Sequence, residues 1–266
     1  MGIINCTPDS FYSASRRLDP RQAIETGIRM VEEGADILDV GGESSRPGSD
    51  PVSNEEELNR VLPVIEGLIK SVDVPISIDT YKSLVAKAAL ELGGHIINDI
   101  SGLGFDTELG SVAAQYDVPV ILMHIKGKPK NMQMNPSYGN VVNEIYAYFE
   151  ERLKFAIGFG IKKEQVVLDP GLGFGKHLRH NYEIVNDLKK FANLGCPILV
   201  GPSRKSFIQK VLNLPSEEAK EGSLAMATAA ILKGAHIIRV HDVKEMKRAA
   251  QIADFLIRTP NTGESV

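Results

Sequence analysis

The stretch VPISIDTYK, residues 74–82, contains the pattern on which the fold prediction depends. It begins with a short aliphatic run, residues 74–78, that has no clean polar alternation. Such a run is typical of a strand that is buried on both faces. The run ends in Asp79, and a helical pattern follows over residues 82–92. The local unit is therefore a buried strand, a polar residue at its carboxyl end, and a helix.

The same unit recurs along the whole chain without a composition break or linker. Eight consecutive strand–helix units most simply close into a (β/α)8 TIM barrel, which uses about 250 residues. We therefore expect one domain over residues 1–258 and a frayed tail over 259–266. A doubly wound open sheet is the alternative, because it also alternates strands and helices. The expected strands are 1–4, 37–40, 74–78, 95–97, 118–123, 166–168, 197–200 and 236–240. The expected helices are 20–33, 54–71 with Asn54 as its N-cap, 82–92, 107–116, 141–159, 182–191, 217–233 and 243–257.

Composition places the chain among ordinary globular proteins. It has 266 residues, 43% hydrophobic and 24% charged, and a formal net charge of -4. That charge weakly disfavours non-specific binding to nucleic acid. The two cysteines, Cys6 and Cys196, have no metal-ligand spacing, which suggests free thiols in a reducing compartment. No apolar run reaches the roughly 20 residues that span a bilayer. We therefore expect a cytoplasmic protein with no nucleic-acid or membrane partner.

Almost every expected strand ends in a polar side chain. In a (β/α)8 barrel all strand carboxyl ends lie on one face, which holds the active site. A helix N-cap could explain any single residue of this kind. It explains the whole set poorly, because buried carboxylates are costly unless they are partnered. The strand-end residues are Asn5, Asp39, Asp79, Asn98 with Asp99, His124, Asp169, Ser203 to Lys205, and Arg239 with His241.

The residue types at these ends favour a flat heterocycle and an anion as ligands. A carboxylate can accept two parallel hydrogen bonds from an amino group and a neighbouring ring N–H, and an amide can both donate and accept. Arg239 and His241 are two residues apart and point to the same side of their strand. With Asn5 and Arg46 they could hold a pyrophosphate. Asn5 also offers a hard oxygen to Mg2+. The alternative is a salt-bridged arginine and a structural histidine.

Three loop segments complete the pattern. The sequence DPGLGFGK, residues 169–176, lacks the first glycine and the final Ser or Thr of a nucleotide phosphate loop. We reject nucleotide triphosphate binding and expect the glycines to allow close backbone approach to a ligand. The loops 5–18 and 41–53 are long and rich in Ser, Gly and Pro. Their length and place at the barrel mouth favour lids.

Taken in order, these segments resemble the dihydropteroate synthase family over essentially the entire chain. The matching motifs are MGIINCTPDSF (1–11), DVGGESSRPGS (39–49), ISIDTYK (76–82), INDISG (97–102), LMHIKGKPKNMQ (122–133), DPGLGFGK (169–176), GPSRKSF (201–207) and RVHDV (239–243). The resemblance implies a TIM barrel that joins a pterin diphosphate to p-aminobenzoate with Mg2+, releasing diphosphate. It also implies a homodimer and a sulfonamide target.

The resemblance assigns residues to each part of the site. Catalytic roles would fall to Asp79, Asp169, Lys205, Arg239 and His241. The pterin would be bound by Asp79, Asn98, Ile100, Met123, Asp169, Phe174, Gly201, Lys205 and Arg239. The diphosphate would be bound by Asn5, Arg46, Arg239 and His241, with Asn5 near the metal. The p-aminobenzoate would be bound by Phe11, Ser45, Arg46, Pro47, Lys205 and Ser206.

Two departures and two competing functions remain open at this point. Ser13 stands where the family has an Asp in the first loop, and Ser45 stands where Thr is usual. A methyltetrahydrofolate-binding methyltransferase barrel would share the pterin-binding Asp and Asn. It has no leaving diphosphate and little reason to gather Lys205, Arg239 and His241. A non-catalytic pterin-binding relative is supported only by the altered first loop.

Overall fold

Parallel strands form the inner layer of the molecule. The computed structural model describes residues 1–7 and 19–259. Strands β1 to β6 pair in chain order as one parallel sheet, and β7 pairs with β8. In the described part of the chain the strands are β1 Gly2–Asn5, β2 Leu38–Gly41, β3 Ile76–Asp79, β4 Ile96–Asp99, β5 Val120–Met123, β6 Val166–Asp169, β7 Leu199–Val200 and β8 Ile237–Ile238.

Two parallel bridges join the two sheets into a closed barrel. Leu168 on β6 pairs with Ile198 just before β7. At the other seam Gly2 pairs with Val240, and the Ile3 N–H donates to the Val240 carbonyl at 2.9 Å. Each strand therefore lies between its neighbours in sequence, and β1 lies beside the chain after β8. This order confirms the (β/α)8 barrel and excludes the doubly wound open sheet, in which the strand order reverses.

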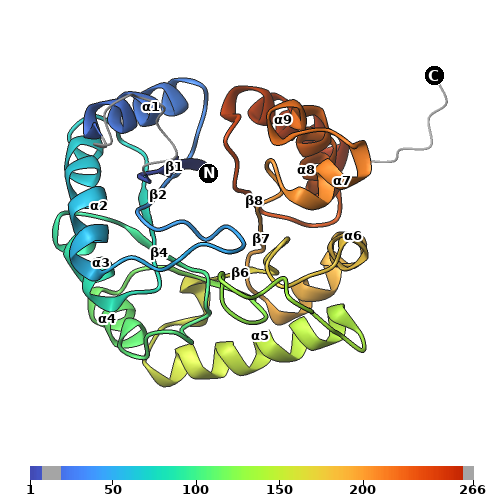
Figure 1. Cartoon of the computed structure of the whole chain (residues 1–266), viewed down its shortest axis with the longest axis horizontal. Helices are drawn as coiled ribbons and strands as arrows, with labels where there is room; N and C mark the ends of the chain where they lie inside the picture. Colours follow the sequence, from blue (N-terminus) through green and yellow to red (C-terminus); the bar gives the residue numbers. More distant parts are fainter. Residues whose placement is uncertain (8–18, 260–266) are drawn as a thin grey trace.

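Helices surround the strands on the outside (Figure 1). Helix α1 begins where Asp19 caps the chain and Pro20 occupies the first helical position, and its exit passes through Gly34 at φ +101°. The helices are α1 Pro20–Glu32, α2 Asn54–Ile69, α3 Ser83–Glu91, α4 Glu108–Tyr116, α5 Val141–Gly158, α6 Leu178–Asn186, α7 Ser206–Leu212, α8 Lys220–Leu232 and α9 Val243–Arg258. Short 3-10 turns cover Lys163–Gln165, Leu188–Leu194 and Ser216–Glu218.

Three helix predictions needed correction. Ser53, not Asn54, caps α2, because its hydroxyl accepts from the Glu56 N–H at 3.1 Å. The helix expected over 182–191 is split into α6 and the 3-10 turn Leu188–Leu194. Helix α7 was not anticipated, since its seven residues are too few to show a period clearly. The expected tail lies outside the described residues except for Thr259.

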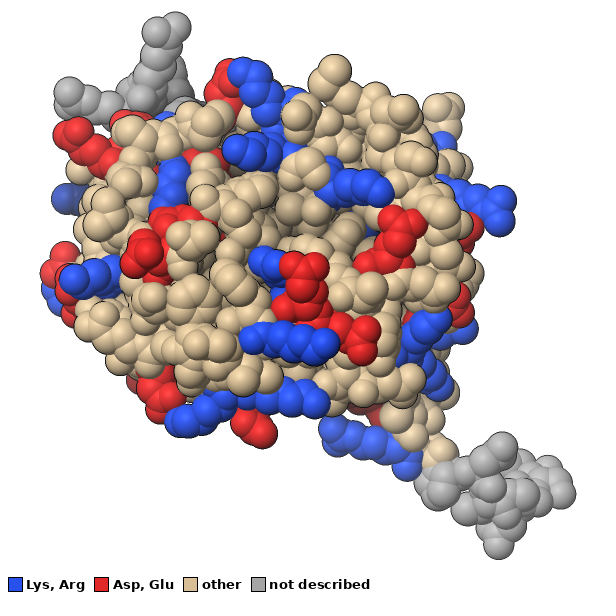
Figure 2. All heavy atoms as spheres, turned by 90° about the horizontal axis from the view of Figure 1, so that it is seen from below, with Lys and Arg blue, Asp and Glu red and all other residues tan. Residues whose placement is uncertain are grey.

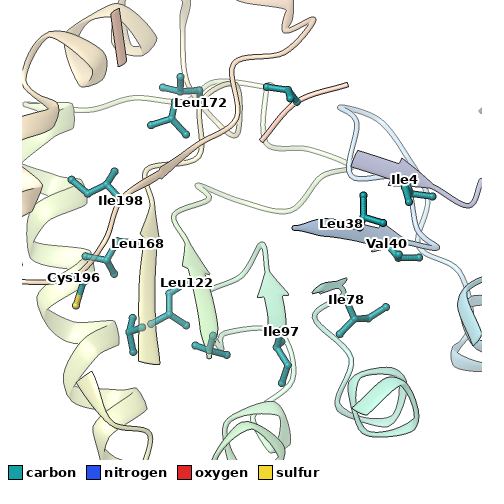
Figure 3. Close-up of a cluster of buried hydrophobic side chains, with 14 of the residues drawn as sticks. Ile4, Leu38, Val40, Ile78, Ile97, Leu122, Leu168, Leu172, Cys196 and Ile198 are labelled. Carbon is teal, nitrogen blue, oxygen red and sulfur yellow. The ribbon is translucent and has the colours of Figure 1, made fainter. Parts of the chain in front are cut away.

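Side chains alternate along each strand between the barrel interior and the helix layer. On β2, Leu38 and Val40 belong to the main hydrophobic core, whereas Asp39 between them reaches across the barrel to Arg239. Figure 3 shows this outward layer on neighbouring strands, with Val40, Ile78 and Leu122 among its labelled members. Because the period is two, every strand delivers its outward side chains to the core and its inward ones to the axis.

The described surface adds little to the functional argument. No helix of the described residues is long and apolar enough to cross a membrane. Cys6 and Cys196 are both buried free thiols. On the face shown in Figure 2, basic and acidic side chains are interspersed and no single sign dominates. That face therefore offers no continuous basic surface of the kind that binds nucleic acid.

Candidate active site

A pocket opens at the carboxyl ends of the strands. Its wall combines charged groups from the barrel interior with an apolar side built by Ile100, Met123 and Phe174, which pack together. A flat, partly polar ligand would fit such a mixed wall. All nine residues predicted to bind the pterin are present. The lining comprises Ser45, Asp79, Asn98, Ile100, Met123, Asp169, Leu172, Phe174, Gly201, Lys205 and Arg239.

Arg239 organises the polar side of the cavity. Its Nε donates to Asp39 Oδ2 and its terminal nitrogen donates to Asp79 Oδ2, both at 2.6 Å. Asp39 also accepts from the Asn98 amide at 3.0 Å. Asp39 is fully buried, and its Oδ1 has no hydrogen-bond partner among the described residues. The network fixes the directions of Asp79 and Asn98, which both line the cavity.

Asp79 is the most perturbed carboxylate in this network. Burial raises its pKa to about 7, against the opposing effect of Arg239 and with a further rise from Asp39. A carboxylate held in this state gains strongly from a ligand that donates hydrogen bonds to it. The geometry therefore favours recognition of a heterocycle with adjacent N–H groups.

The neighbouring pair Asn98 and Asp99 divides between two roles. Asn98 is an inward residue of β4 and lines the cavity. Asp99 faces the other way and is fully buried, where it accepts from the backbone N–H groups of Ser101 and Leu103 and from the Ser101 hydroxyl. We expected both residues to offer acceptors to a ligand. Asp99 instead shapes the turn after β4.

Asp169 and Lys205 form the opposite side of the cavity. Asp169 Oδ1 accepts from the Gly171 N–H at 2.7 Å, and burial raises the pKa of this carboxyl. Lys205 lies with its ammonium 4.3 Å from the centre of the Phe174 ring. Burial, together with repulsion from Arg239, lowers the pKa of Lys205 to about 8. A carboxylate acceptor and a cationic donor thus face the same space.

The glycines of the segment 169–176 also have a packing role that the sequence did not predict. A Cβ on Gly171 would lie 2.1 Å from the His124 carbonyl oxygen, and one on Gly175 would lie 2.4 Å from the Lys126 carbonyl oxygen. Both residues also have positive φ. Their small size lets this loop pack on the segment after β5. An added Cβ on Gly171 would also lie 3.2 Å from Met123, and one on Gly173 would lie 3.5 Å from Lys205, and both of these neighbours line the cavity.

His124 is another strand-end residue that does not line the cavity. It is buried, with its Nδ1 3.0 Å from the Lys176 ammonium, which also donates to the Phe174 carbonyl at 2.9 Å. Burial, reinforced by Lys176, lowers the pKa of His124 well below its usual value. Lys176 ties the loop after β5 to the loop after β6, behind the apolar wall.

A strained turn after β7 presents Lys205. Arg204 has a positive φ of 55°, which is unusual for a residue with a side chain. The Arg204 guanidinium donates two hydrogen bonds to Asp242, and the Arg204 backbone N–H donates to the Ser223 hydroxyl at 3.0 Å. Lys205 then stands at the N-cap of α7. These contacts over-determine the turn and fix the direction from which Lys205 enters the cavity.

His241 is held beside this turn by Ser203. Ser203 Oγ accepts from the His241 backbone N–H at 3.3 Å and lies 3.0 Å from His241 Nδ1. Because Oγ already accepts one hydrogen, its own hydrogen is available to Nδ1, which favours an imidazole protonated on Nε2. Burial lowers the pKa of His241 to about 4, and Arg239 and Arg204 act in the same direction. A neutral N–H donor results.

Of the remaining predicted residues, Ser45 alone among the described ones belongs to the cavity lining. Ser45 is part of the lining, whereas the neighbouring Arg46 and Pro47 are exposed on the same loop. Ser206 is exposed at the start of α7. Asn5 ends β1 beside Gly41, and His241 follows β8. Phe11 and Ser13 lie outside the described residues.

Sequence reasoning gave no role to two residues that the structure places in the site. Asp39 was recognised only as a polar strand end, although it accepts hydrogen bonds from both Arg239 and Asn98. Its inward parity on β2 could have revealed it. Leu172 was treated as part of a glycine-rich loop, and nothing in the sequence marks it as a lining residue.

Comparison with known proteins agrees with this geometry. The family model described as pterin binding enzyme matches residues 1–241. A dihydropteroate synthase from Synechocystis sp. is 45% identical over 259 residues, which cover 97% of this chain and 90% of the relative. The Yersinia pestis dihydropteroate synthase, solved with a sulfonamide drug complex, superposes with a TM-score of 0.93 at 42% identity, covering 97% and 94% of the two chains. The Xanthomonas albilineans enzyme, solved with 4-aminobenzoic acid, gives 0.92 at 39% identity, covering 97% and 93%.

Proposed function

This chain belongs to the dihydropteroate synthases, within the family of pterin binding enzymes, and from that premise we propose how its residues carry out the reaction. The enzyme is a transferase (EC 2.5.1.15). It condenses 6-hydroxymethyl-7,8-dihydropterin diphosphate with p-aminobenzoate to give 7,8-dihydropteroate and diphosphate, a step of folate biosynthesis. The barrel forms a single domain that holds both substrates at its carboxyl-terminal face.

The pterin ring occupies the cavity at the strand ends. Asp79 accepts hydrogen bonds from adjacent N–H groups of the ring, and Asn98 and Asp169 complete its edge. Phe174 and Met123 pack against the ring on the apolar side. Asp79 is already oriented by Arg239 at 2.6 Å, so little reorganisation is needed on binding. Both carboxylates also stabilise positive charge that develops on the pterin as the diphosphate leaves.

The diphosphate lies toward the last strand. Arg239 and His241 follow β8 two residues apart, and Lys205 lines the cavity from the turn after β7. Neutral His241 donates from Nε2, because Ser203 engages Nδ1. Arg46 approaches from the 41–53 loop. These donors stabilise the negative charge on the departing diphosphate. No covalent enzyme nucleophile is needed, and both cysteines are buried and absent from the cavity lining.

Mg2+ accompanies the diphosphate in this proposal. Within the described residues no group of three or more His, Cys, Asp or Glu side chains could hold a metal ion. Asn5 offers a single hard oxygen at the end of β1. One protein oxygen suits Mg2+, which keeps several waters and takes its other ligands from phosphates. When bound, the ion would neutralise charge on the leaving group.

The p-aminobenzoate binds at the rim of the cavity. Ser45 already lines the cavity, and Arg46, Pro47, Ser206 and Phe11 would complete the subsite when the loops close. Lys205 lies between the two substrates, with its ammonium on the Phe174 ring. The Xanthomonas albilineans relative was solved with 4-aminobenzoic acid. Sulfonamides, which resemble this substrate, are expected to compete with it.

The chain forms a homodimer in this proposal and works in the cytoplasm. Exposed apolar side chains gather on the last helices, where Phe255 is 72% and Ile252 66% exposed. Val211 and Leu212 on α7 are also exposed. Such a surface is typical of an interface between subunits. Analytical ultracentrifugation of the native chain and of Phe255→Glu tests the dimer. Buried free thiols suit a reducing compartment.

The observation that carries the function is the convergence of Asp79, Asn98, Asp169 and Lys205 on one cavity. Incubation of the purified protein with the pterin diphosphate, Mg2+ and p-aminobenzoate should release dihydropteroate and diphosphate in equal amounts. A methyl-transfer barrel would instead bind methyltetrahydrofolate and release no diphosphate. Pterin binding without any turnover by folded protein would identify a non-catalytic relative.

A further inference from the structure

A second buried cluster of charged side chains lies at the base of the 41–53 loop. The Lys82 ammonium is 2.6 Å from Glu43 Oε2, 2.6 Å from Glu57 Oε2 and 2.6 Å from the Val52 carbonyl oxygen. The side chains of Lys82, Glu43 and Glu57 are only 10%, 11% and 1% exposed. Lys82 follows β3, Glu43 follows β2, and Glu57 belongs to the first turn of α2. The cluster therefore connects three separate elements.

The cluster fastens both ends of the loop. Glu43, near the start of the loop, accepts from the Val52 N–H at 3.1 Å, and Lys82 holds the Val52 carbonyl. The intervening residues 44–51 form a tip that carries Ser45 to the cavity. Residues 41–51 contain no Val, Ile, Leu, Met or aromatic side chain. Hydrophobic burial therefore contributes little to holding residues 41–51, and the buried ion pairs anchor the loop at its base.

Within the tip, the Ser49 hydroxyl lies within hydrogen-bond distance of the Ser44 and Arg46 carbonyls, whereas the contacts of the tip to the rest of the described residues are weaker and lie at the surface. The Gly48 N–H donates to the Pro129 carbonyl at 3.0 Å. Lys130 pairs with Asp50 at 2.8 Å, but these side chains are 70% and 76% exposed. An exposed pair of this kind contributes little. The position of the tip relative to the cavity therefore depends on the buried contacts of Glu43, Lys82 and Val52 at the base of the loop.

Tyr81 connects the same cluster to the pterin wall. Its hydroxyl donates to Glu43 Oε1 at 2.9 Å. Its ring packs against the cluster of Ile100, Met123, Met132 and Phe174, of which three members line the cavity. Glu43 therefore has both carboxylate oxygens engaged, one by Tyr81 and the other by Lys82 and Val52. It does not line the cavity, so it acts on the site through the loop.

We propose that Glu43, clamped by Lys82 and Tyr81, is a positioning residue that sets the 41–53 loop over the pterin cavity and so shapes the p-aminobenzoate subsite. The inference rests on the proposed function, because it assigns Ser45 to Pro47 to the second substrate. It differs from a purely structural role in one respect. The clamp selects for the second substrate and leaves the strand-end residues that hold the pterin untouched.

The variant Glu43→Gln tests this role with little change of shape. The amide still accepts from Tyr81, and Lys82 keeps Glu57 as its counter-ion, so no buried charge is left unpaired. We expect the KM for p-aminobenzoate to rise about tenfold, equivalent to about 1.4 kcal/mol of binding free energy. The Kd of a non-reacting pterin, measured by calorimetry, should stay within about twofold of its value in the unmodified protein. Hydrogen exchange of the peptide 41–53 should become faster.

Two further variants keep the test decisive. Tyr81→Phe retains the ring and removes only the bond to Glu43, so a smaller rise in the same KM is expected. Asp50→Asn, on the exposed tip of the same loop, is the matched control and should leave the KM, the pterin Kd and the exchange rate unchanged. An equal loss of pterin and p-aminobenzoate affinity in Glu43→Gln or Tyr81→Phe, or no change in either variant, overturns the inference. Absence of turnover by the unmodified protein would count against the proposed function instead.

Discussion

Two buried clusters in this barrel have the same composition, one cation between two carboxylates, and different surroundings. Arg239 bridges Asp39 and Asp79 at the strand ends, and two of these three residues line the cavity. Lys82 bridges Glu43 and Glu57 beneath a loop, and none of the three lines the cavity. The first cluster has a carboxyl with a pKa raised to about 7. The second is shielded and joins three elements of backbone.

The difference separates recognition from positioning. At the strand ends, Asp79 and Arg239 pair with each other and also line the cavity, so both can meet a ligand. At the loop base, the ammonium of Lys82 has three acceptors and Glu43 uses both oxygens within the protein. A change in the first cluster should therefore alter ligand binding, and a change in the second should alter stability and loop position.

The largest effect is expected from Lys82→Met. The change leaves two buried carboxylates without their cation, which costs about 3–5 kcal/mol in comparable buried pairs. Urea unfolding should show this loss as a lower midpoint with an unchanged slope. Lys87→Met, which removes a long exposed pair to Glu91 at 3.9 Å, is the control and should change stability by less than about 0.5 kcal/mol. Equal losses in the two variants would contradict the comparison.

Asp79→Asn should cause the next largest effect, on binding. The amide cannot accept from both ring N–H groups, so pterin affinity should fall about 100-fold, or about 2.7 kcal/mol. Stability at pH 8 should change little. At pH 8 the ionised form of Asp79 opposes folding, because its pKa is higher in the folded state than its ordinary value. The substitution removes this unfavourable charge together with one ion pair to Arg239, and Arg239 still keeps Asp39 as its partner. Calorimetry measures the affinity, with the surface variant Asp36→Asn as a control. Unchanged affinity would refute the assignment.

A smaller effect is expected from pH. Below pH 7 the free protein holds a proton on Asp79, because burial raises this pKa to about 7. Binding requires the carboxylate, so the proton is released and affinity rises with pH, by about tenfold between pH 5 and pH 6 and about fivefold between pH 6 and pH 7. Above the pKa the curve should flatten. In Asp79→Asn the contribution of this group to the slope should disappear. A slope that persists unchanged would assign the proton to another group.

The smallest effect concerns the diphosphate side. His241→Ala should weaken diphosphate binding about fivefold and leave a bare pterin within about twofold, since one neutral hydrogen bond contributes about 1 kcal/mol. Ser203→Ala should weaken diphosphate binding about threefold, because without the Ser203 hydroxyl the His241 imidazole is no longer restricted to the tautomer protonated on Nε2. Nitrogen NMR of His241 should then show mixed tautomers. Equal losses for both ligands would make His241 a structural residue.

Much of the site could be predicted because strand parity and the strand–helix repeat are local patterns. Short buried strands ending in polar residues predicted the barrel, and the nine residues that the family motifs assign to the pterin all line the cavity. The same rules could not separate Asn98 from Asp99 in function until the turn after β4 was known. They also predicted that His124 faces the barrel mouth, whereas in the structure His124 contacts Lys176 behind the apolar wall of the cavity.

The sequence by itself determined the strand–helix repeat, the face on which the site lies and the residue types gathered there, because these follow from periods of two and 3.6 residues along the chain. Only the tertiary structure decided which residues pair. Arg239 meets Asp39 and Asp79 across 200 and 160 residues of chain, and Lys82 finds Glu43 and Glu57 beneath a loop. These pairings depend on barrel closure and on the reach of each side chain, and neither is encoded in local spacing.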